Sequence, residues 1–214
     1  MIQIRKSRNW TIAGVTSFLL FLALTFAVML NSTKLNLFDT SIQQIIQKIV
    51  NPIQTNIFAI ITFMGSPLVD IVLTLGIALF FWHTRNRKTA IWILITQLLG
   101  DAIAFFVKEF VQRVRPTKQL IPDTGFSYPS GHTFSTALLC LTILFIVLPD
   151  IKNQKKQFVL AVLTVIWFCL VAFSRIYLRN HFPSDVLASL LLALSCWTCM
   201  YEGYLHYSYQ SRFI

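Results

Sequence analysis

Residues 10–30 have the sequence WTIAGVTSFLLFLALTFAVML, an apolar run without a charged side chain. An α-helix needs about 20 such residues to cross the roughly 30 Å hydrocarbon core of a bilayer. Arg5, Lys6 and Arg8 precede the run, and basic residues favour the cytoplasmic side of a membrane. The run is too long for the apolar region of a signal peptide and lacks a clear small-residue cleavage site. We therefore predict a retained transmembrane helix with the N-terminus in the cytoplasm.

Five further apolar runs follow, and we interpret each as a transmembrane helix. They cover residues 67–82, 89–110, 131–148, 158–174 and 183–201. The first of these five is short, and the apolar residues 57–64 before it are able to extend it. All the runs are too long and too unbroken for the strands of a β-barrel. The sequence thus predicts an all-α polytopic membrane protein, with six transmembrane helices in a single domain over residues 1–214.

An amphipathic stretch lies between the first two predicted spans. Within residues 40–54, one helical stripe carries apolar side chains: Ile42, Ile45, Ile46, Ile49, Val50 and Ile53. Glutamine, lysine and asparagine side chains occupy the opposite face. The preceding residues Asp39, Thr40 and Ser41 are of the kind that caps helix N-termini. This pattern predicts a helix that lies in the outer membrane interface.

The composition supports the same class of protein. Hydrophobic residues make up 56% of the 214 residues and charged residues only 12%, with a mean hydropathy of +0.66, whereas a soluble domain has roughly 25% charged residues. These values argue against a soluble enzyme and exclude a disordered chain. The net charge of +10 does not indicate a nucleic-acid partner, because the basic residues lie in short clusters between apolar runs. More than half of the 18 Lys and Arg residues fall on the predicted cytoplasmic side, which places both termini there.

Three polar clusters interrupt the apolar background. They are KEFVQRVRP from Lys108, YPSGH from Tyr128 and SRIYLRNHFPSD from Ser174. The topology, which rests on hydropathy alone, places all three clusters on the outer face of the membrane. We therefore expect the three clusters to form one site.

Lys108 and Arg115 lie seven residues apart, so the two side chains share one helical face if the helix persists as far as Arg115, and Pro116 then ends the helix. Alternatively, both extend to lipid headgroups, as basic residues at span ends commonly do. Asp101 lies two turns before Lys108 on the same face and is a candidate partner for it. We interpret Asp101 and Asp70 as structural residues.

The other two clusters combine a helix start with two histidines. Ser130 is a natural N-cap for the span that begins at Gly131, and the free amides of Gly131 and His132 would bind a phosphate readily. A plain capped turn is the alternative for this segment. His181 and Asp185 are four residues apart, so the carboxylate is able to reach back to the imidazole. A carboxylate on one ring nitrogen fixes the tautomer and leaves the other nitrogen as nucleophile or base.

Together the clusters read K-x6-RP, PSGH and SR-x5-H-x3-D. This set resembles the three-part signature of the type 2 phosphatidic acid phosphatase (PAP2) superfamily, and every signature position is matched between residues 108 and 185. The six-span hydropathy extends the likeness over nearly the whole chain. Within the superfamily, the sequence is most similar to the small bacterial membrane lipid phosphatases of the phosphatidylglycerophosphate phosphatase B type.

The resemblance implies a role for each signature residue. His181 would attack phosphorus and form a phosphohistidine, Asp185 would orient the ring, and His132 would protonate the leaving group and later activate water. The residues that would bind the phosphate are Lys108, Arg115, Ser130, Gly131 and Arg175. The resemblance implies neither a cofactor nor a metal ion.

The implied substrate is a phosphomonoester lipid, of the phosphatidic acid or phosphatidylglycerophosphate type, that is hydrolysed at the outer face of a bacterial plasma membrane. Undecaprenyl diphosphate is an alternative substrate that the signature does not separate from the first, and phosphotransfer to a second lipid is an alternative reaction. A lipid transporter or channel without catalysis is the alternative from another class. It needs polar residues along a path through the bundle, and the spans offer few beyond Gln97 and Asp101. The oligomeric state stays open.

Overall fold

The computed structural model describes residues 2–84 and 86–210, which contain helices and no β-strand. The α-helices of this described chain are α1 (Ile2–Met29), α2 (Thr33–Gln47), α3 (Pro52–Met64), α4 (Pro67–Thr84), α5 (Arg87–Val111), α6 (Gly131–Thr142), α7 (Gln154–Tyr177) and α8 (Pro183–Gln210). Six of them are long and apolar enough to cross a membrane, namely α1, α4, α5, α6 with its continuation to Asp150, α7 and α8. The predicted all-α class and the six spans are confirmed.

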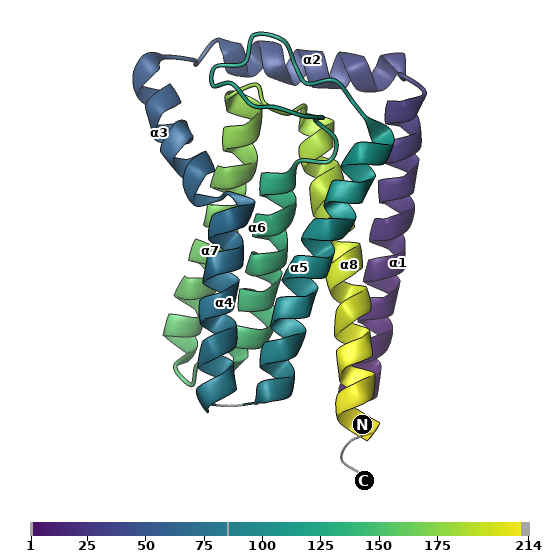
Figure 1. Ribbon diagram of the computed structural model, residues 1–214, viewed down its shortest axis with the longest axis vertical. Coiled ribbons are helices and arrows are strands. Elements are labelled where there is room, and N and C mark those ends of the chain that lie inside the picture. The colour runs from purple at the N-terminus through teal and green to yellow at the C-terminus, as the bar shows by residue number, and fades with distance from the viewer. Residues whose placement is uncertain (1, 85, 211–214) are drawn as a thin grey trace.

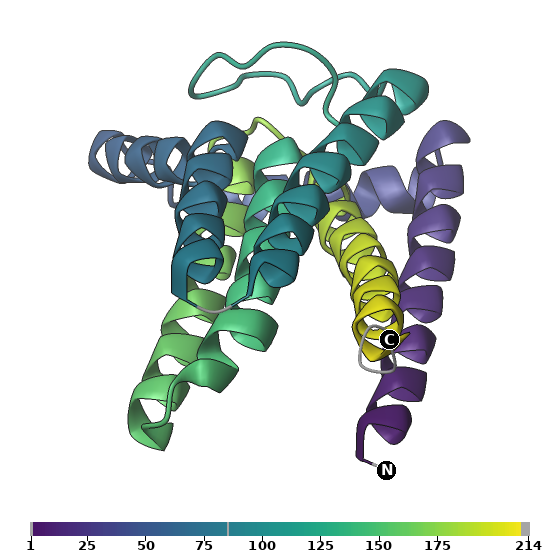
Figure 2. The ribbon, with the colours of Figure 1, turned by 60° about the horizontal axis from the view of Figure 1, so that its bottom comes forward.

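The central element of the bundle is α6 (Figure 1). It contacts α4, α5, α7 and α8, whereas α1 packs mainly on α8. Phe134 and Leu138 of α6 belong to the same buried core as Trp197 of α8. Figure 2 shows the α1–α8 pair diverging from α6 and α7 toward the end of the bundle that carries the N-terminus. Large apolar side chains such as Phe106 and Phe158 are exposed on the outside, as expected of a surface that faces lipid.

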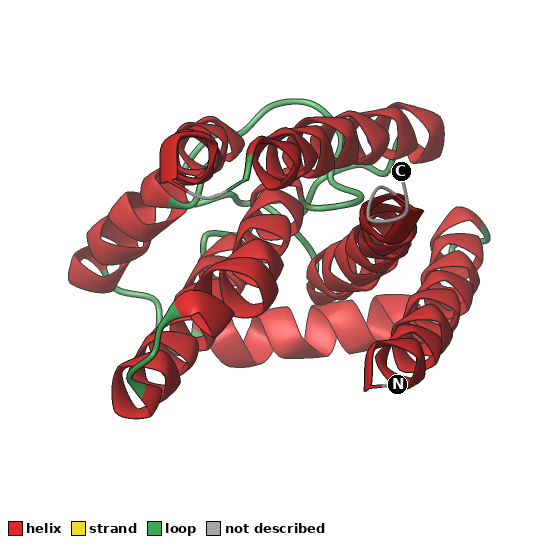
Figure 3. Ribbon diagram, turned by 90° about the horizontal axis from the view of Figure 1, so that it is seen from below, coloured by secondary structure: helices red, strands yellow, loops and turns green. Residues whose placement is uncertain are grey.

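The predicted amphipathic helix exists, but its limits differ from the prediction. α2 begins at Thr33 and lies across one end of the spans, opposite to the chain termini (Figures 1 and 3). Asp39 is therefore not a capping residue but a buried residue inside α2. Ile46 is buried as well, whereas Ile45 and Ile49 of the predicted apolar stripe are exposed.

A break after Gln47 separates α2 from α3. The side chain of Asn51 caps α3 by accepting a hydrogen bond from the backbone N–H of Gln54 (2.9 Å), and Pro52 is the first residue of the helix. Proline has no backbone N–H and disfavours a helical conformation in the residue before it, so one helix does not continue through Pro52. The apolar residues 57–64 belong to α3 and do not extend the second span.

α5 ends at Val111, close to the predicted end of the span at residue 110, and does not continue to Arg115. Gln112 adopts a left-handed conformation (φ 51°), and its N–H donates to the carbonyl of Lys108. This conformation is typical of a residue that stops a helix, so Pro116 is not the cause of the stop. Residues 113–130 then form a loop across the end of the bundle (Figure 1). Arg115 lies in this loop, so the helix does not persist as far as Arg115 and the two basic residues do not share a helical face.

Candidate active site

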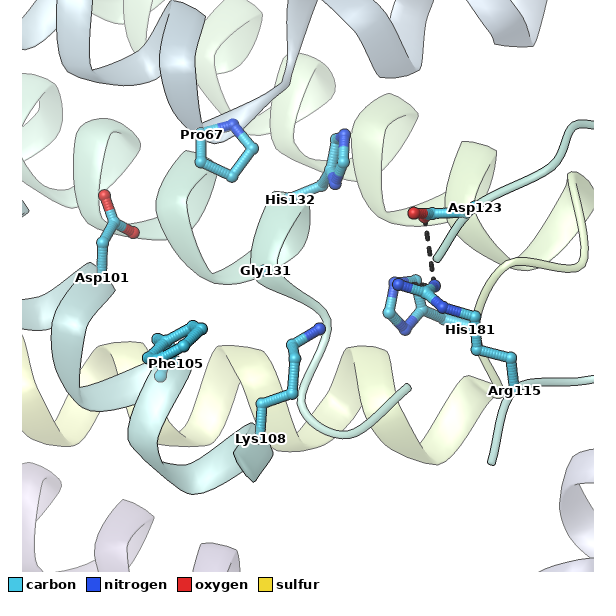
Figure 4. Close-up of a pocket in the computed structure, with 10 residues that line it drawn as sticks. Pro67, Asp101, Phe105, Lys108, Arg115, Asp123, Gly131, His132 and His181 are labelled. Carbon is cyan, nitrogen blue, oxygen red and sulfur yellow. Dashed lines mark hydrogen bonds and ion pairs between the residues drawn. The ribbon is translucent and has the colours of Figure 1, made fainter. Parts of the chain in front are cut away.

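Residues from all three polar clusters meet at one cavity of about 300 Å³. It lies at the end of α5, beside the first turn of α6 and beneath the loop between these helices. The predicted site residues that line it are Lys108, Arg115, Gly131, His132 and His181 (Figure 4). Asp101 and Asp123, which were not predicted as site residues, line it as well. Tertiary structure thus brings together side chains that are more than 70 positions apart in the sequence.

The imidazole of His181 is 1% exposed and is held at both nitrogens. Nδ1 lies 2.6 Å from the carbonyl oxygen of Ser127, and Nε2 lies 3.1 Å from Nη1 of Arg115. A carbonyl only accepts and a guanidinium only donates, so Nδ1 carries the proton and Nε2 presents its lone pair. Burial, aided by the cations of Arg175 and Arg115, lowers the pKa of His181 well below its ordinary value. The ring is therefore neutral at neutral pH.

Asp185 reaches back toward the imidazole as predicted, but it is not the hydrogen-bond acceptor of the ring. Its Oδ2 lies 3.6 Å from Nδ1 of His181, which already donates to the closer carbonyl of Ser127. Oδ2 accepts instead from the backbone N–H of Phe182 (2.9 Å), and Oδ1 accepts from Nη1 of Arg113 (2.6 Å). The carboxylate therefore closes the turn that carries His181 and places a negative charge near the ring.

Arg113 has no role in the sequence motif, yet it links several parts of the site. Nη1 also donates to Oγ of Ser184 (2.7 Å), and Nη2 donates to Oδ2 of Asp39 (2.7 Å). The guanidinium carbon lies 4.1 Å from the centre of the Phe182 ring, within the range of a cation–π contact. Spacing alone does not distinguish this partly buried arginine from an exposed one, so the sequence pattern gave no signal for it.

Asp39 anchors α2 to the first turn of α8. Its Oδ1 accepts from the backbone N–H of Ser184 (2.9 Å), and its Oδ2 accepts from the Ser184 hydroxyl (2.6 Å). Gln43 and Ile46, four and seven residues further along, are also buried, so these three residues define the face of α2 that contacts the protein. The spacing of these three residues is visible in the sequence and could have predicted the buried face of α2. The isoleucine stripe instead predicted a different face of the helix as the buried one.

Asp123 is a second acidic residue without a predicted role. Its Oδ2 contacts both Nη2 of Arg175 and Nη1 of Arg115, the latter at 3.1 Å. Arg175 is 3% exposed and also donates through Nη1 to Oγ1 of Thr62 in α3 (2.6 Å). Burial acts to raise the pKa of Asp123, but the two guanidinium groups outweigh burial and hold the pKa below its usual range. Asp123 is thus ionised between two predicted phosphate ligands.

Arg115 is held in place mainly by backbone carbonyls. Nη2 donates to Thr124 (2.7 Å), Nε donates to Gly125 (3.0 Å) and Nη1 donates to Asn180 (2.9 Å). The first two acceptors belong to the same loop as Arg115, so the loop fixes the direction of the guanidinium. Nη1 is the nitrogen that also contacts His181.

Lys108 does not pair with Asp101 as predicted. Its Nζ donates to the carbonyl of Phe126 in the loop after α5 (3.1 Å). Asp101 accepts from Nε2 of Gln97 (3.0 Å) and from Oγ of Ser135 (3.2 Å). The reason is that the loop brings a backbone acceptor over the end of α5, while Asp101 lies two turns deeper and finds its partners within α5 and α6.

The start of α6 confirms the predicted cap. The buried Oγ of Ser130 accepts from the backbone N–H of Thr133 (3.4 Å) and lies 3.0 Å from the Thr133 hydroxyl. His132 lines the cavity, and Figure 4 shows its ring near Asp123. No hydrogen bond joins the His132 ring to another described residue. It is therefore available for proton exchange with a group bound in the cavity.

The charges around the cavity suit an anionic ligand. Lys108 and Arg115 line the cavity, and Arg175 reaches it through its contact with Asp123. Asp123 is paired with the two arginines, and Asp101, the other acid in the lining, lies deeper along α5. The Nε–H of Arg175 is buried and has no acceptor among the described atoms, and such a donor is normally satisfied by a partner. Within the described ranges, no three His, Cys, Asp or Glu side chains lie together as a metal site requires.

Comparisons with known proteins assign the family. The PAP2 superfamily profile matches residues 89–207, which is more than half of the chain. The chain belongs to the PAP2 superfamily. Phosphatidylglycerophosphatase B of Bacillus subtilis is 29% identical to this PAP2 protein over 189 residues, which cover 84% of this chain and 89% of the relative. Undecaprenyl-diphosphatase BcrC of the same organism is 32% identical over 120 residues, which cover 53% and 57%.

A solved structure agrees with the fold. The crystal structure of a transmembrane PAP2-type phosphatidylglycerolphosphate phosphatase from Bacillus subtilis matches this PAP2 protein with a TM-score of 0.77 and 25% identity, and the match covers 88% of this chain and 94% of the other. The protein is therefore a multi-pass membrane phosphatase, which confirms the predicted family and enzyme class. The roles of the individual site residues stay predictions.

Proposed function

We propose that this PAP2 protein hydrolyses a phosphomonoester carried on a lipid, through a phosphohistidine on His181 and without a metal ion. The observation that carries the proposal is the hydrogen bond from Nδ1 of His181 to Ser127, which leaves an unprotonated Nε2 at the cavity beside Arg115. A histidine nucleophile needs this form, a neutral ring with one unprotonated nitrogen.

The reaction then proceeds in two steps. In the first, the Nε2 lone pair of His181 attacks phosphorus, the bond between phosphorus and the lipid oxygen breaks, and a protonated His132 gives its proton to that oxygen. In the second, His132 takes a proton from water, the water oxygen attacks phosphorus, and orthophosphate leaves Nε2. The acceptors near Nδ1, the Ser127 carbonyl and the Asp185 carboxylate, favour the positive charge that the ring gains in the intermediate.

The phosphate oxygens would be bound by fixed donors around the cavity. Lys108, Arg115 and Arg175 supply positive charge, and the amide of Gly131 and the hydroxyl of Ser130 lie at the N-terminus of α6. Such donors stabilise the charge of a trigonal-bipyramidal transition state without having to reorient.

A lipid substrate fits the position of the cavity. From the basic residues the cavity continues along α5 to Phe105 and Ala104, which lie within a membrane span. The names of the relatives point to two lipid phosphates, phosphatidylglycerophosphate and undecaprenyl diphosphate. We favour the phosphomonoester, because the phosphatidylglycerophosphatase match covers 84% of this chain and the undecaprenyl-diphosphatase match covers 53%.

We infer that the cavity faces the outer side of a bacterial plasma membrane. α2 and the loop of residues 113–130 lie at the cavity end of the bundle, and α5 and α7 begin at the other end (Figure 1). Arg87 and Lys88 lie at the start of α5, and basic residues favour the cytoplasmic side. Arg85 and Arg212, which the predicted topology also places there, lie outside the described residues.

The test is phosphate release by detergent-purified protein in EDTA, with phosphatidic acid, phosphatidylglycerophosphate and undecaprenyl diphosphate assayed in parallel. We expect release from a lipid phosphomonoester that persists in EDTA and is lost in His181→Ala. Glu109→Gln removes an exposed carboxylate next to Lys108 and should retain activity.

Three results would contradict parts of the proposal. Activity of His181→Ala that stays close to wild type would exclude the phosphohistidine, and loss of wild-type activity in EDTA would exclude a metal-independent reaction. Preference for undecaprenyl diphosphate would select the alternative substrate. Mass spectrometry of the alkali-quenched enzyme should find the covalent phosphate on the peptide that contains His181.

A further inference from the structure

Two guanidinium groups converge on one oxygen atom inside the cavity. Nη2 of Arg175 and Nη1 of Arg115, the latter at 3.1 Å, both contact Oδ2 of Asp123. Figure 4 shows this carboxylate beside His132 and His181. An anionic oxygen held by two arginines next to the nucleophile occupies the position that the proposed mechanism gives to a phosphate oxygen.

Most of the other donors of these arginines are used elsewhere. Arg115 donates through Nε and Nη2 to carbonyls of its own loop, and Arg175 donates through Nη1 to Thr62. Nη1 of Arg115 has two hydrogens and already faces Asn180 and Nε2 of His181 in addition to Asp123. A phosphate that engages both arginines through their terminal nitrogens therefore competes with Asp123 for them.

We propose that Asp123 is an internal anion that exchanges with the phosphate group. It holds Arg115 and Arg175 while the cavity is empty, turns away when the substrate phosphate binds, and returns to compete with the orthophosphate that hydrolysis produces. Asp123 thereby weakens phosphate binding and promotes product release. This inference rests on the proposed function and assigns a role within it to a residue outside the three motifs.

The surroundings of Asp123 allow it to move. Its side chain is 26% exposed, whereas the side chains of Arg115 and Arg175 are 9% and 3% exposed, so the acid is the partner that is able to turn toward solvent. Its other oxygen, Oδ1, accepts from the N–H of the adjacent Thr124 (2.9 Å), a contact within the loop that does not tie Asp123 to a helix.

A phosphate group is the stronger ligand for the two arginines. Asp123 offers a single oxygen to both of them and leaves the buried Nε–H of Arg175 without an acceptor among the described atoms. A phosphate monoester carries more charge and more free oxygens, so it is able to bind both guanidinium groups through separate contacts. When orthophosphate leaves, the carboxylate of Asp123 returns and compensates the positive charges of Arg115 and Arg175.

The test is the affinity for inorganic phosphate, measured by isothermal titration calorimetry on detergent-purified protein. Asp123→Asn keeps the shape of the side chain but removes its charge. We expect it to bind orthophosphate about tenfold more tightly than wild type, as the loss of one competing charge-assisted contact implies. Asp123→Glu retains the charge and should bind close to wild type. Glu109→Gln removes an exposed carboxylate outside the cavity and is the matched control for a general change in charge.

Kinetic measurements separate this role from a positioning role. With the lipid substrate, Asp123→Asn should show a lower KM and stronger inhibition by orthophosphate, whereas loss of a residue that merely positions the arginines would weaken both. Unchanged or weaker phosphate binding by Asp123→Asn would overturn the proposal. If that variant aggregates on gel filtration, Asp123→Ser carries the same expectation and the same contrary outcome.

The results also distinguish this inference from the proposed function. If wild type releases no phosphate from any lipid while Asp123→Asn binds orthophosphate more tightly, the proposed function fails and the anion exchange stands. If wild type is active and Asp123→Asn gains no affinity, the proposed function stands and the anion exchange fails.

Discussion

The chemistry assigned to His181 depends on one backbone atom. The carbonyl oxygen of Ser127, 2.6 Å from Nδ1, only accepts a hydrogen bond, so it selects the tautomer with an unprotonated Nε2. Asp185, the partner suggested by the sequence, contributes a charge 3.6 Å away and supports the turn through Phe182. The motif therefore predicts part of the candidate site, and the hydrogen bonds show how each of its residues is held.

The tautomer and the protonation state of His181 are directly measurable. Burial and the nearby cations of Arg175 and Arg115 hold the pKa of His181 well below its ordinary value, so the neutral nucleophilic form persists as the pH falls below about 6.5. Nitrogen NMR of protein with isotopically labelled histidine should show a neutral, Nδ1-protonated ring at neutral pH and a titration midpoint below about 6.5. His181→Gln assigns the signal. An Nε2-protonated ring, or a midpoint at the ordinary value, would contradict the mechanism.

At the scale of helices, the interfacial helix α2 is part of the support of the site. Asp39 of α2 and Asp185 of α8 lie 2.7 Å and 2.6 Å from the two terminal nitrogens of Arg113, in the loop after α5. One guanidinium group thus joins three elements that are remote in the sequence. This arrangement connects the position of α2 on the bundle to the turn that carries His181.

Replacement of Arg113 should therefore affect both stability and catalysis. Removal of one partner from a buried ion pair costs about 3–5 kcal/mol, because it leaves a charge uncompensated. We expect Arg113→Met to melt at a lower temperature in detergent and to lose kcat more than it changes KM. Lys34→Met removes an exposed charge from α2 and should alter neither property. Wild-type stability of Arg113→Met would show that these ion pairs contribute little.

At the scale of the whole molecule, the cavity and the basic starts of α5 and α7 lie at opposite ends of the bundle (Figure 1). If the positive residues are cytoplasmic, the cavity end faces outward. The orientation of the bundle in the membrane therefore determines from which side a substrate phosphate reaches the cavity.

Cysteine labelling of intact cells tests this orientation. In a protein without its native cysteines, Lys118→Cys in the loop at the cavity end should react with a membrane-impermeant maleimide. Lys155→Cys at the start of α7 should react only after the membrane is permeabilised. The reverse pattern would place the active site in the cytoplasm and would overturn the assignment to the outer face.

The sequence by itself determined the fold class, the six spans and the family. A membrane span is a local property, because about 20 consecutive apolar residues must pair their backbone groups within one helix. The cap at Ser130 is local as well, since its acceptor and donor are three residues apart. The motif residues were identified for the same reason: their spacing is visible in the printed sequence.

Only the tertiary structure decided how these residues are paired. The proton acceptor of His181 is 54 residues away in the chain, and the serine that binds Asp39 is 145 residues away. Local spacing predicted Asp185 as the partner of His181 and Asp101 as the partner of Lys108, because a sequence pattern relates only residues that are close together in the chain. A buried donor forms its hydrogen bond with the acceptor that lies nearest to it. Which acceptor is nearest depends on how loops and helices from distant parts of the chain pack together.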